Sequence, residues 1–165
     1  IRQCVRDGRM EEARNLLGYP YFVSGTVISG DQRGRTLGFP TANLSIARNK
    51  LLPHPGVYGG MVFVEGVPYA TAVNIGHNPT FEGVRSIRVE AYLSGYAGDL
   101  YGVSLELHLL FHLRNERKFP SSVELIAQLR EDAQEISHRV RLWNASEEGE
   151  KILSRLRRTS IPGKE

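Results

Sequence analysis

A segment rich in glycine, arginine and threonine, residues 30–43, carries the side chains in this sequence that are best suited to chemistry. It reads Gly-Asp-Gln-Arg-Gly-Arg-Thr-Leu-Gly-Phe-Pro-Thr-Ala-Asn. Glycines let backbone amides approach an anion without a Cβ in the way, and arginines supply charge-assisted donors to phosphate oxygens. The segment therefore suits a phosphate-binding loop. A Gly-rich connection with solvated arginines has the same composition, so composition alone leaves both interpretations open.

The spacing within this segment excludes two common phosphate motifs and allows a metal site. No Gly-Lys-Ser/Thr follows four residues after a glycine, and the GxGxxG pattern is absent. Thr41 and Asn43 lie two residues apart, so in an extended segment their side chains point the same way. Mg²⁺ accepts such neutral oxygen ligands together with phosphate oxygens and waters. Hydrogen bonds that stabilise a turn are the other interpretation of this pair.

The elements that must position this loop are mostly strands. Segments of β-branched and aromatic composition predict strands at residues 21–28, 58–64, 69–75, 87–93 and 103–113. In the last of them Leu105, Leu107, Leu109 and Phe111 alternate, so we expect them on one face. Residues 65–68 have the length of a hairpin turn, which makes their flanking strands antiparallel neighbours. Five or more short strands without intervening helices favour a closed barrel or a sandwich.

Helices are predicted at both ends of the strand region. After Pro120 an apolar stripe recurs every three to four residues and predicts a helix of about twenty residues, with Ser121 and Glu124 in a capping-box pattern. We expect this helix to pack against the barrel. Residues 3–17 predict two short helical stretches that end at Gly18, and residues 146–165 one or two more turns before the chain frays.

Length and composition limit the class of protein. A chain of 165 residues with 41% hydrophobic content can bury one core. Because the sequence has no run of 18 apolar residues, it predicts no membrane-spanning helix. The net charge of +3 gives little support for a nucleic-acid partner. The lone Cys4 cannot form an internal disulfide, which fits a reducing cytoplasm. Because Ile1 is not preceded by Met, we expect this chain to be a segment of a longer protein.

Several ordered blocks of the sequence resemble riboflavin kinases. Residues 34–43 resemble the family's signature, with Pro-Thr-Ala-Asn at 40–43 as its most specific element, and further blocks follow at 55–58, 74–76, 79–81, 99–102 and 113–119. The resemblance implies a mainly β fold, a closed six-stranded antiparallel Greek-key β-barrel with a packed C-terminal α-helix. It also implies transfer of the γ-phosphate of ATP to riboflavin, with FMN and ADP as products and no nucleic-acid or membrane partner.

The resemblance also assigns roles to residues. It implies that Thr41 and Asn43 hold Mg²⁺ with the ATP phosphates, and that Glu90, nine residues before Asp99, is the catalytic base. From the residues alone, a strand glutamate beside Arg85 and Arg88 is usually part of a solvated ion pair. The implied ATP site comprises Gly30, Arg33, Gly34, Arg35, Thr41, Asn43, Leu93 and Tyr101. The implied flavin site comprises Arg114, Arg117 and Phe119.

The sequence departs from the family pattern in places. Asp31-Gln32 stand where the family usually has another glycine, and Tyr92 stands where many members have histidine. Residues 1–18 resemble the end of the adenylyltransferase half of bifunctional FAD synthetases, which implies covalent linkage to an N-terminal FMN adenylyltransferase module. We therefore divide the chain into this remnant, a kinase barrel with its helix at 19–145, and a tail at 146–165. A non-catalytic FMN-binding split barrel and an oligonucleotide-binding barrel are the rival interpretations.

Overall fold

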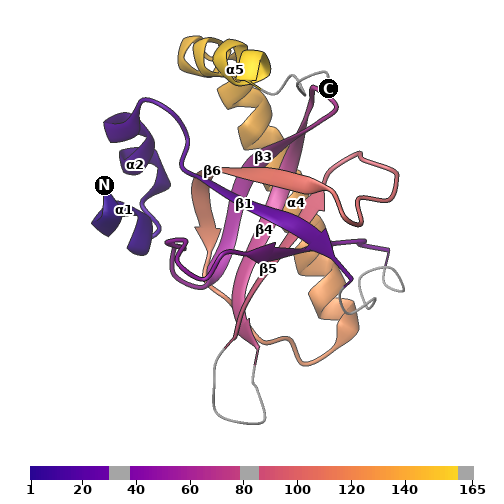
Figure 1. The fold of residues 1–165 in the computed structure, drawn as a ribbon. Coiled ribbons are helices and arrows are strands. Elements are labelled where there is room, and N and C mark those ends of the chain that lie inside the picture. Colours follow the sequence, from indigo (N-terminus) through magenta and orange to yellow (C-terminus); the bar gives the residue numbers. More distant parts are fainter. Residues whose placement is uncertain (30–37, 79–85, 160–165) are drawn as a thin grey trace.

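The fold is a closed antiparallel β-barrel flanked by helices (Figure 1). The computed structural model describes residues 1–29, 38–78 and 86–159. Within these ranges six strands close in the order β1-β2-β5-β4-β3-β6. Since β2 and β3 are not neighbours, the chain crosses one end of the barrel between them, as in a Greek key. The mainly β class and the closed six-stranded barrel predicted from the sequence are confirmed.

Each strand is antiparallel to both of its neighbours. The strands are β1 (Phe22–Ile28), β2 (Ala42–Ile46), β3 (Gly56–Val64), β4 (Val67–Asn78), β5 (Ser86–Leu93) and β6 (Ser104–Arg114). All except β2 were predicted to within three residues at each end. The first residues of β2 belong to the segment that the sequence identified as a loop, and its five residues are too few for a clear alternation. This short strand closes the barrel between β1 and β5.

The inside of the barrel is filled by apolar side chains, which form the main core. Alternate residues of the strands point inward, among them Leu44, Ile75, Val89 and Leu107, each at most 6% exposed. Burial of one such side chain stabilises the fold by about 1.5–3 kcal/mol. Tyr58 is also fully buried, and its hydroxyl donates a hydrogen bond of 2.7 Å to the carbonyl oxygen of His54. The interior therefore serves stability.

Strand β6 departs from simple alternation. Its pairing with β3 shifts register twice, between Val57 and Tyr58 and again between Gly59 and Gly60, so β6 contains bulges. Leu105, Leu107 and Leu109 point into the core as predicted, but Phe111 lies in the outer cluster under the C-terminal helix. The prediction that Phe111 shares their face was wrong, because a bulge reverses the alternation before it is reached.

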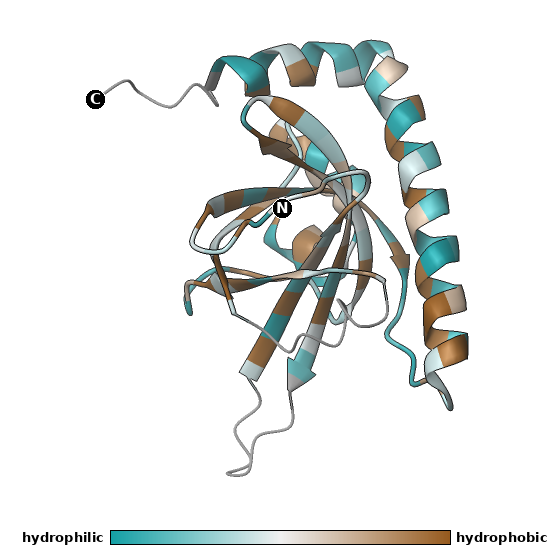
Figure 2. Cartoon of the chain, turned by 90° about the vertical axis from the view of Figure 1, so that its right-hand side faces the viewer, coloured by the Kyte–Doolittle hydropathy of each residue, from teal (hydrophilic) through white to brown (hydrophobic). Residues whose placement is uncertain are grey.

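A long helix, α4 (Ser122–Ala145), covers the outer face of β3, β4 and β6. Figure 2 shows it running alongside the barrel wall. Its buried residues Ile136 and Val140 pack on an outer cluster with Val57, Leu110 and Phe111. At its start the Ser121 hydroxyl accepts a hydrogen bond of 3.3 Å from the amide of Glu124, as the capping pattern predicted.

The remaining helices pack around one end of this assembly. Helices α1 (Arg2–Arg6) and α2 (Met10–Leu17) precede the barrel, and α2 ends at Gly18 in the left-handed conformation, as predicted. The buried Arg14 of α2 donates to the carbonyl oxygen of Leu110 at 2.9 Å and to Glu148 at 3.0 Å. Helix α5 (Glu147–Thr159) is longer than the one or two turns expected. No helix in the described ranges has the length and apolar character needed to cross a membrane.

Candidate active site

A row of residues in register crosses five strands on the outer face of the barrel. In order from β2 to β6 it consists of Asn43, Glu90, Asn74, Val57 and Arg114. Residues directly opposite each other in an antiparallel pair share one face of the sheet, and neighbouring strands lie ~4.8 Å apart. Since the next residues along three of these strands point into the core, this row faces outward. Polar side chains from distant parts of the sequence are thereby aligned.

A cavity of about 640 Å³ opens between this outer face and the first half of α4. Thr41, Asn74 and Glu90 lie along its sheet side, and Leu125 and Leu129 of α4 form an apolar wall. The segment between β6 and α4 contributes Arg114, Arg117 and Phe119. One cavity therefore joins a carboxylate, neutral oxygen ligands, guanidinium groups and an aromatic ring, the combination that a phosphorylated aromatic ligand requires.

Glu90 lines the sheet side of this cavity. Its side chain is 21% exposed, and the Nε of Arg88 lies 3.5 Å from its Oε1. Arg88 stands two residues earlier on β5, so both side chains leave the same face of the strand. The ion pair considered from the sequence is thus present, and Glu90 also lines the cavity. The two interpretations of this residue hold together.

Thr41 and Asn43 lie on the strand beside Glu90. Thr41 lines the cavity immediately before β2, and Asn43 is the Cα partner of Glu90 in the β2–β5 ladder. Because they are two residues apart on an extended segment, they face the same side. Two neutral side-chain oxygens next to a carboxylate fit a hydrated divalent cation that takes its other ligands from phosphate. The donor set present therefore fits the predicted metal.

The other end of the cavity has a cationic and aromatic character. The guanidinium carbon of Arg117 lies 4.6 Å from the centre of the Phe119 ring, and that of Arg114 lies 5.8 Å away. Both distances are within the range of cation–π attraction. The structure thus brings together the residues predicted to contact the flavin.

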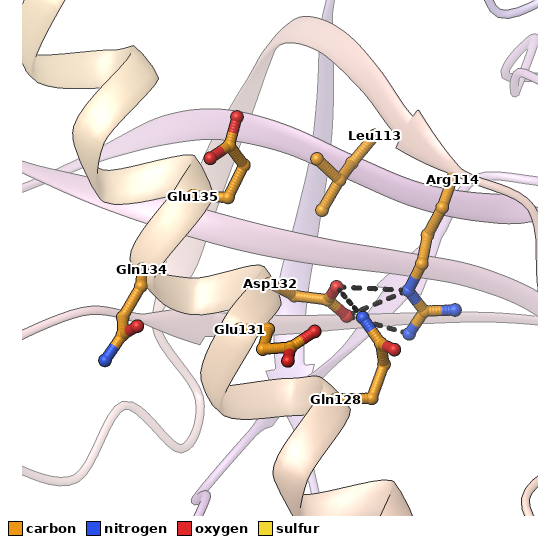
Figure 3. A pocket seen from close by; sticks show the side chains of 7 residues that line it. All are labelled: Leu113, Arg114, Gln128, Glu131, Asp132, Gln134 and Glu135. Atoms are coloured by element: carbon orange, nitrogen blue, oxygen red, sulfur yellow. Dashed lines mark hydrogen bonds and ion pairs between the residues drawn. The ribbon is translucent and has the colours of Figure 1, made fainter.

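Arg114 is held by a buried carboxylate that the sequence did not single out (Figure 3). Asp132 of α4 is 3% exposed and accepts hydrogen bonds from Arg114 Nε at 3.0 and 3.1 Å and from Nη2 at 2.8 Å. Gln128, one turn earlier, donates to Asp132 at 2.9 Å. An acidic residue inside the apolar stripe of a helix was the available signal for Asp132.

A second cavity, of about 550 Å³, lies beside the Arg114–Asp132 pair and is also lined by Glu131, Gln134 and Glu135.

Other predicted site residues lie elsewhere or outside the described ranges. The side chain of Leu93 is 6% exposed and packs in the barrel interior, away from the cavity. Tyr101 is 67% exposed in the turn before β6 and does not line the cavity. Gly30, Arg33, Gly34 and Arg35 fall outside the described residues. The ATP-contacting roles of these residues stay predictions.

Comparison with known proteins identifies the family. Residues 17–140 match the family model described as riboflavin kinase. The chain belongs to the riboflavin kinase family. A bifunctional riboflavin kinase/FMN adenylyltransferase of Listeria monocytogenes is 42% identical over 135 residues, which cover 82% of this chain and 43% of the relative. The corresponding protein of Bacillus subtilis is 40% identical over 137 residues, with the same coverage. The chain thus spans less than half the length of these relatives.

Solved structures share the fold. The riboflavin kinase of Trypanosoma brucei superposes with a TM-score of 0.55 at 27% identity, over 74% of this chain and 81% of that one. A structure described as a macrolide-efflux protein from Streptococcus pneumoniae superposes with a TM-score of 0.76 at 36% identity, over 81% of this chain and 43% of that one. The riboflavin kinase barrel inferred from the sequence is therefore confirmed by family match and by structure.

Proposed function

We propose that this chain is a kinase module that transfers the γ-phosphate of ATP to the terminal ribityl hydroxyl of riboflavin, giving FMN and ADP. The observation that carries this proposal is the outward row, in which Glu90, Asn74 and Arg114 line one cavity and Asn43 is the strand partner of Glu90. A phosphate donor at one end and a flavin ring at the other would meet at Glu90.

Glu90 would act as the general base. In phosphoryl transfer the transition state is loose, so catalysis rests on positioning, on charge neutralisation and on a group that accepts the hydroxyl proton. The Glu90 carboxylate would accept that proton from the terminal ribityl hydroxyl. Arg88, 3.5 Å away, restrains the orientation of the carboxylate through its charge.

Thr41 and Asn43 would hold Mg²⁺ together with the phosphates of ATP. When bound, the ion supplies positive charge that neutralises the phosphate oxygens. Asn43 pairs directly with Glu90 across the β2–β5 ladder, so the ion would lie about one strand spacing from the base. The hydroxyl of Thr41 and the carboxamide of Asn43 then orient the phosphate chain toward the nucleophile.

The flavin ring would lie at the other end of the cavity. Phe119 offers an apolar face for a planar ring, and Arg114 and Arg117 beside it offer donors to ring carbonyls or phosphate. Leu125 and Leu129 supply an apolar wall that excludes water from the reacting atoms. These contacts fix the ring so that only its ribityl chain reaches Glu90.

The nucleotide base would lie near the end of β1. The exposed Tyr101 ring offers a stacking face, and the amide of Gly102 beside it donates to the carbonyl oxygen of Val27 at 2.9 Å. Strand β1 leads directly into the segment that contains Gly30, Arg33, Gly34 and Arg35, the proposed phosphate loop. Since the Leu93 side chain is buried in the core, its contact with ATP would come from its backbone.

The chain would be one half of a bifunctional protein. Its relatives are named riboflavin kinase/FMN adenylyltransferase, and it matches 43% of their length. Helices α1 and α2 precede the barrel, and Arg14 fixes α2 to β6 and α5. We therefore place the junction with an adenylyltransferase module at residues 1–18.

A chromatographic assay tests the kinase activity. The protein is incubated with riboflavin, ATP and Mg²⁺, and FMN is resolved from riboflavin by chromatography, with EDTA as a matched control. We expect FMN to accumulate only when ATP and the metal are both present. Protein that binds FMN tightly but forms none under these conditions would be the non-catalytic flavin carrier instead.

A further inference from the structure

Asn74 occupies a central position in the outward row but has no part in the chemistry described so far. It lies on β4, directly opposite Glu90 on β5 and Val57 on β3, and its side chain lines the cavity. Its Oδ1 is buried, and no hydrogen-bond partner is present for it within the described residues. Asn74 thus lines the cavity, while its carbonyl oxygen is covered by protein atoms and has no donor within the described residues.

An unpaired buried oxygen requires a reason, because it destabilises the fold. Leaving a buried acceptor unsatisfied costs about 1–3 kcal/mol, and an apolar side chain of similar size avoids this cost. The neighbouring row position on β3 is indeed apolar, since Val57 packs in the cluster beneath α4. A carboxamide at position 74 therefore indicates a ligand that donates to it when the cavity is filled and the carboxamide has turned its oxygen toward the cavity.

The geometry of the row indicates which part of a ligand reaches Asn74. Glu90 lies one strand away on one side, and Arg114 lies two strands away on the other, at ~4.8 Å per strand. A substrate with its reacting hydroxyl at Glu90 and its ring near Arg114 and Phe119 must pass its connecting chain over Asn74. In riboflavin that chain carries secondary hydroxyls, which both donate and accept hydrogen bonds, as does a carboxamide.

We propose that Asn74 binds the secondary hydroxyls of the ribityl chain and makes the cavity selective for a polyol side chain. This inference rests on the proposed kinase function, since it uses the same orientation of riboflavin. Asn74 is a specificity residue here: it contacts the substrate along its chain and leaves proton transfer to Glu90. Once the carboxamide turns toward the cavity, its oxygen finds its donor in the substrate.

Comparison of two ligands and three proteins tests the proposal. The ligands are riboflavin and a flavin whose chain is a plain alkyl group that keeps only the terminal hydroxyl. Affinity is measured by quenching of flavin fluorescence, and kcat/KM by formation of the phosphorylated product. We expect the wild type to prefer riboflavin by about 10-fold, the effect of one or two satisfied hydrogen bonds. The Asn74→Ala variant should bind the two ligands with equal affinity. That affinity should match the affinity of the wild type for the alkyl analogue.

Asn144 provides a matched control. Its Oδ1 is also buried without a partner within the described residues, but it lies at the far end of α4 and does not line the cavity. Asn144→Ala removes the same chemical group and should keep the wild-type preference. Asn74→Leu fills the space of the lost carboxamide, so it should abolish the preference even if the alanine variant fails to fold.

The outcomes separate this inference from the proposed function. A wild type that does not distinguish the two flavins overturns the role of Asn74, as does an Asn74 variant that keeps the full preference. If the wild type forms FMN in either case, the kinase function stands and only the inference fails. If the wild type binds riboflavin without phosphorylating it, the proposed kinase function is wrong. The fluorescence titration then still decides whether Asn74 binds the hydroxyls of the polyol chain.

Discussion

The inner and outer faces of the same strands have different tasks in this barrel. On β5, Val89 and Ala91 point inward and are at most 2% exposed, whereas Arg88 and Glu90 point outward into the cavity. On β4, Ile75 is in the core while its neighbour Asn74 lines the cavity. The alternation of a strand thus lets one segment supply packing and chemistry together. The effect of a substitution should therefore depend on which face the residue occupies.

The largest expected effect is on catalysis, from the outer face. Glu90→Gln should reduce kcat about 10²–10⁴-fold, the usual contribution of a general base, since the amide cannot accept the hydroxyl proton. The thermal unfolding temperature should hardly change, because no core contact is lost. Turnover and thermal unfolding are measured on the same preparation. Activity within about tenfold of the wild type would refute Glu90 as the base.

The next effect falls where the outer face meets α4. Asp132→Ala leaves Arg114 without its carboxylate and should lower the free energy of unfolding by about 3–5 kcal/mol, measured by urea denaturation. Combining it with Arg114→Met should recover much of this loss, because no uncompensated charge remains. If the double variant is as unstable as the single one, the ion pair is not the source of the loss.

Substitution of a residue on the inner face should have a comparable or smaller effect, and it should change only the free energy of unfolding. Ile75→Ala removes a side chain that is 2% exposed, so the free energy of unfolding should fall by about 2–5 kcal/mol. Its neighbour Asn74 still faces the cavity, so the KM for riboflavin of the folded fraction should be unchanged. A raised KM with normal stability would contradict the division between the faces.

The smallest effect concerns pH. Burial lowers the pKa of His108 to about 4, although the exposed carboxylate of Glu106 lies 3.8 Å from its Nε2. The unfolded state binds the proton first, at a pKa near 6.5, so stability is lost as pH falls from 6.5 toward 4. His112, whose pKa burial also lowers, acts in the same direction. Between pH 7 and pH 5 we expect a loss of about 2 kcal/mol from His108.

Urea denaturation at the two pH values measures this loss, with His108→Leu as the control. The variant should lose less stability between pH 7 and pH 5 than the wild type, because its residue at this position does not titrate. The ring of His108 packs at 5.5 Å from that of Phe22, so an apolar replacement keeps an apolar contact. An identical pH dependence in both proteins would show that His108 binds its proton as readily in the folded state as in the unfolded state.

The sequence predicted the elements well where local pattern decides them. The strands other than β2 and the capped helix α4 follow from β-branched composition and from apolar spacing. The face of Phe111 could not be predicted, because the bulge in β6 arises from pairing with β3, where Gly59 leaves room for the Phe111 ring. Strand β2 was missed because the signature of a functional loop and the start of the strand share residues.

The candidate site was predictable only in part, since its geometry depends on register. Glu90 and Asn43 are 47 residues apart, and only the β2–β5 ladder makes them neighbours. Asn74 stands in one of the blocks that resemble the family, but neither Asn74 nor Asp132 was assigned a role, because the role of each comes from what lies across the sheet or beneath the helix. When a residue acts through contacts with residues distant in the sequence, the pattern of its sequence neighbours does not predict its role.

A crystal structure with riboflavin, Mg²⁺ and a non-hydrolysable ATP analogue tests the central claim most directly. We predict the flavin in the cavity between the outer face and α4, with its ring beside Phe119 and its terminal hydroxyl within hydrogen-bond distance of Glu90. Thr41 and Asn43 should contact the metal and the phosphates. A flavin bound elsewhere, with Glu90 remote from the terminal hydroxyl, would contradict the assignment of chemistry to the outer face of the barrel.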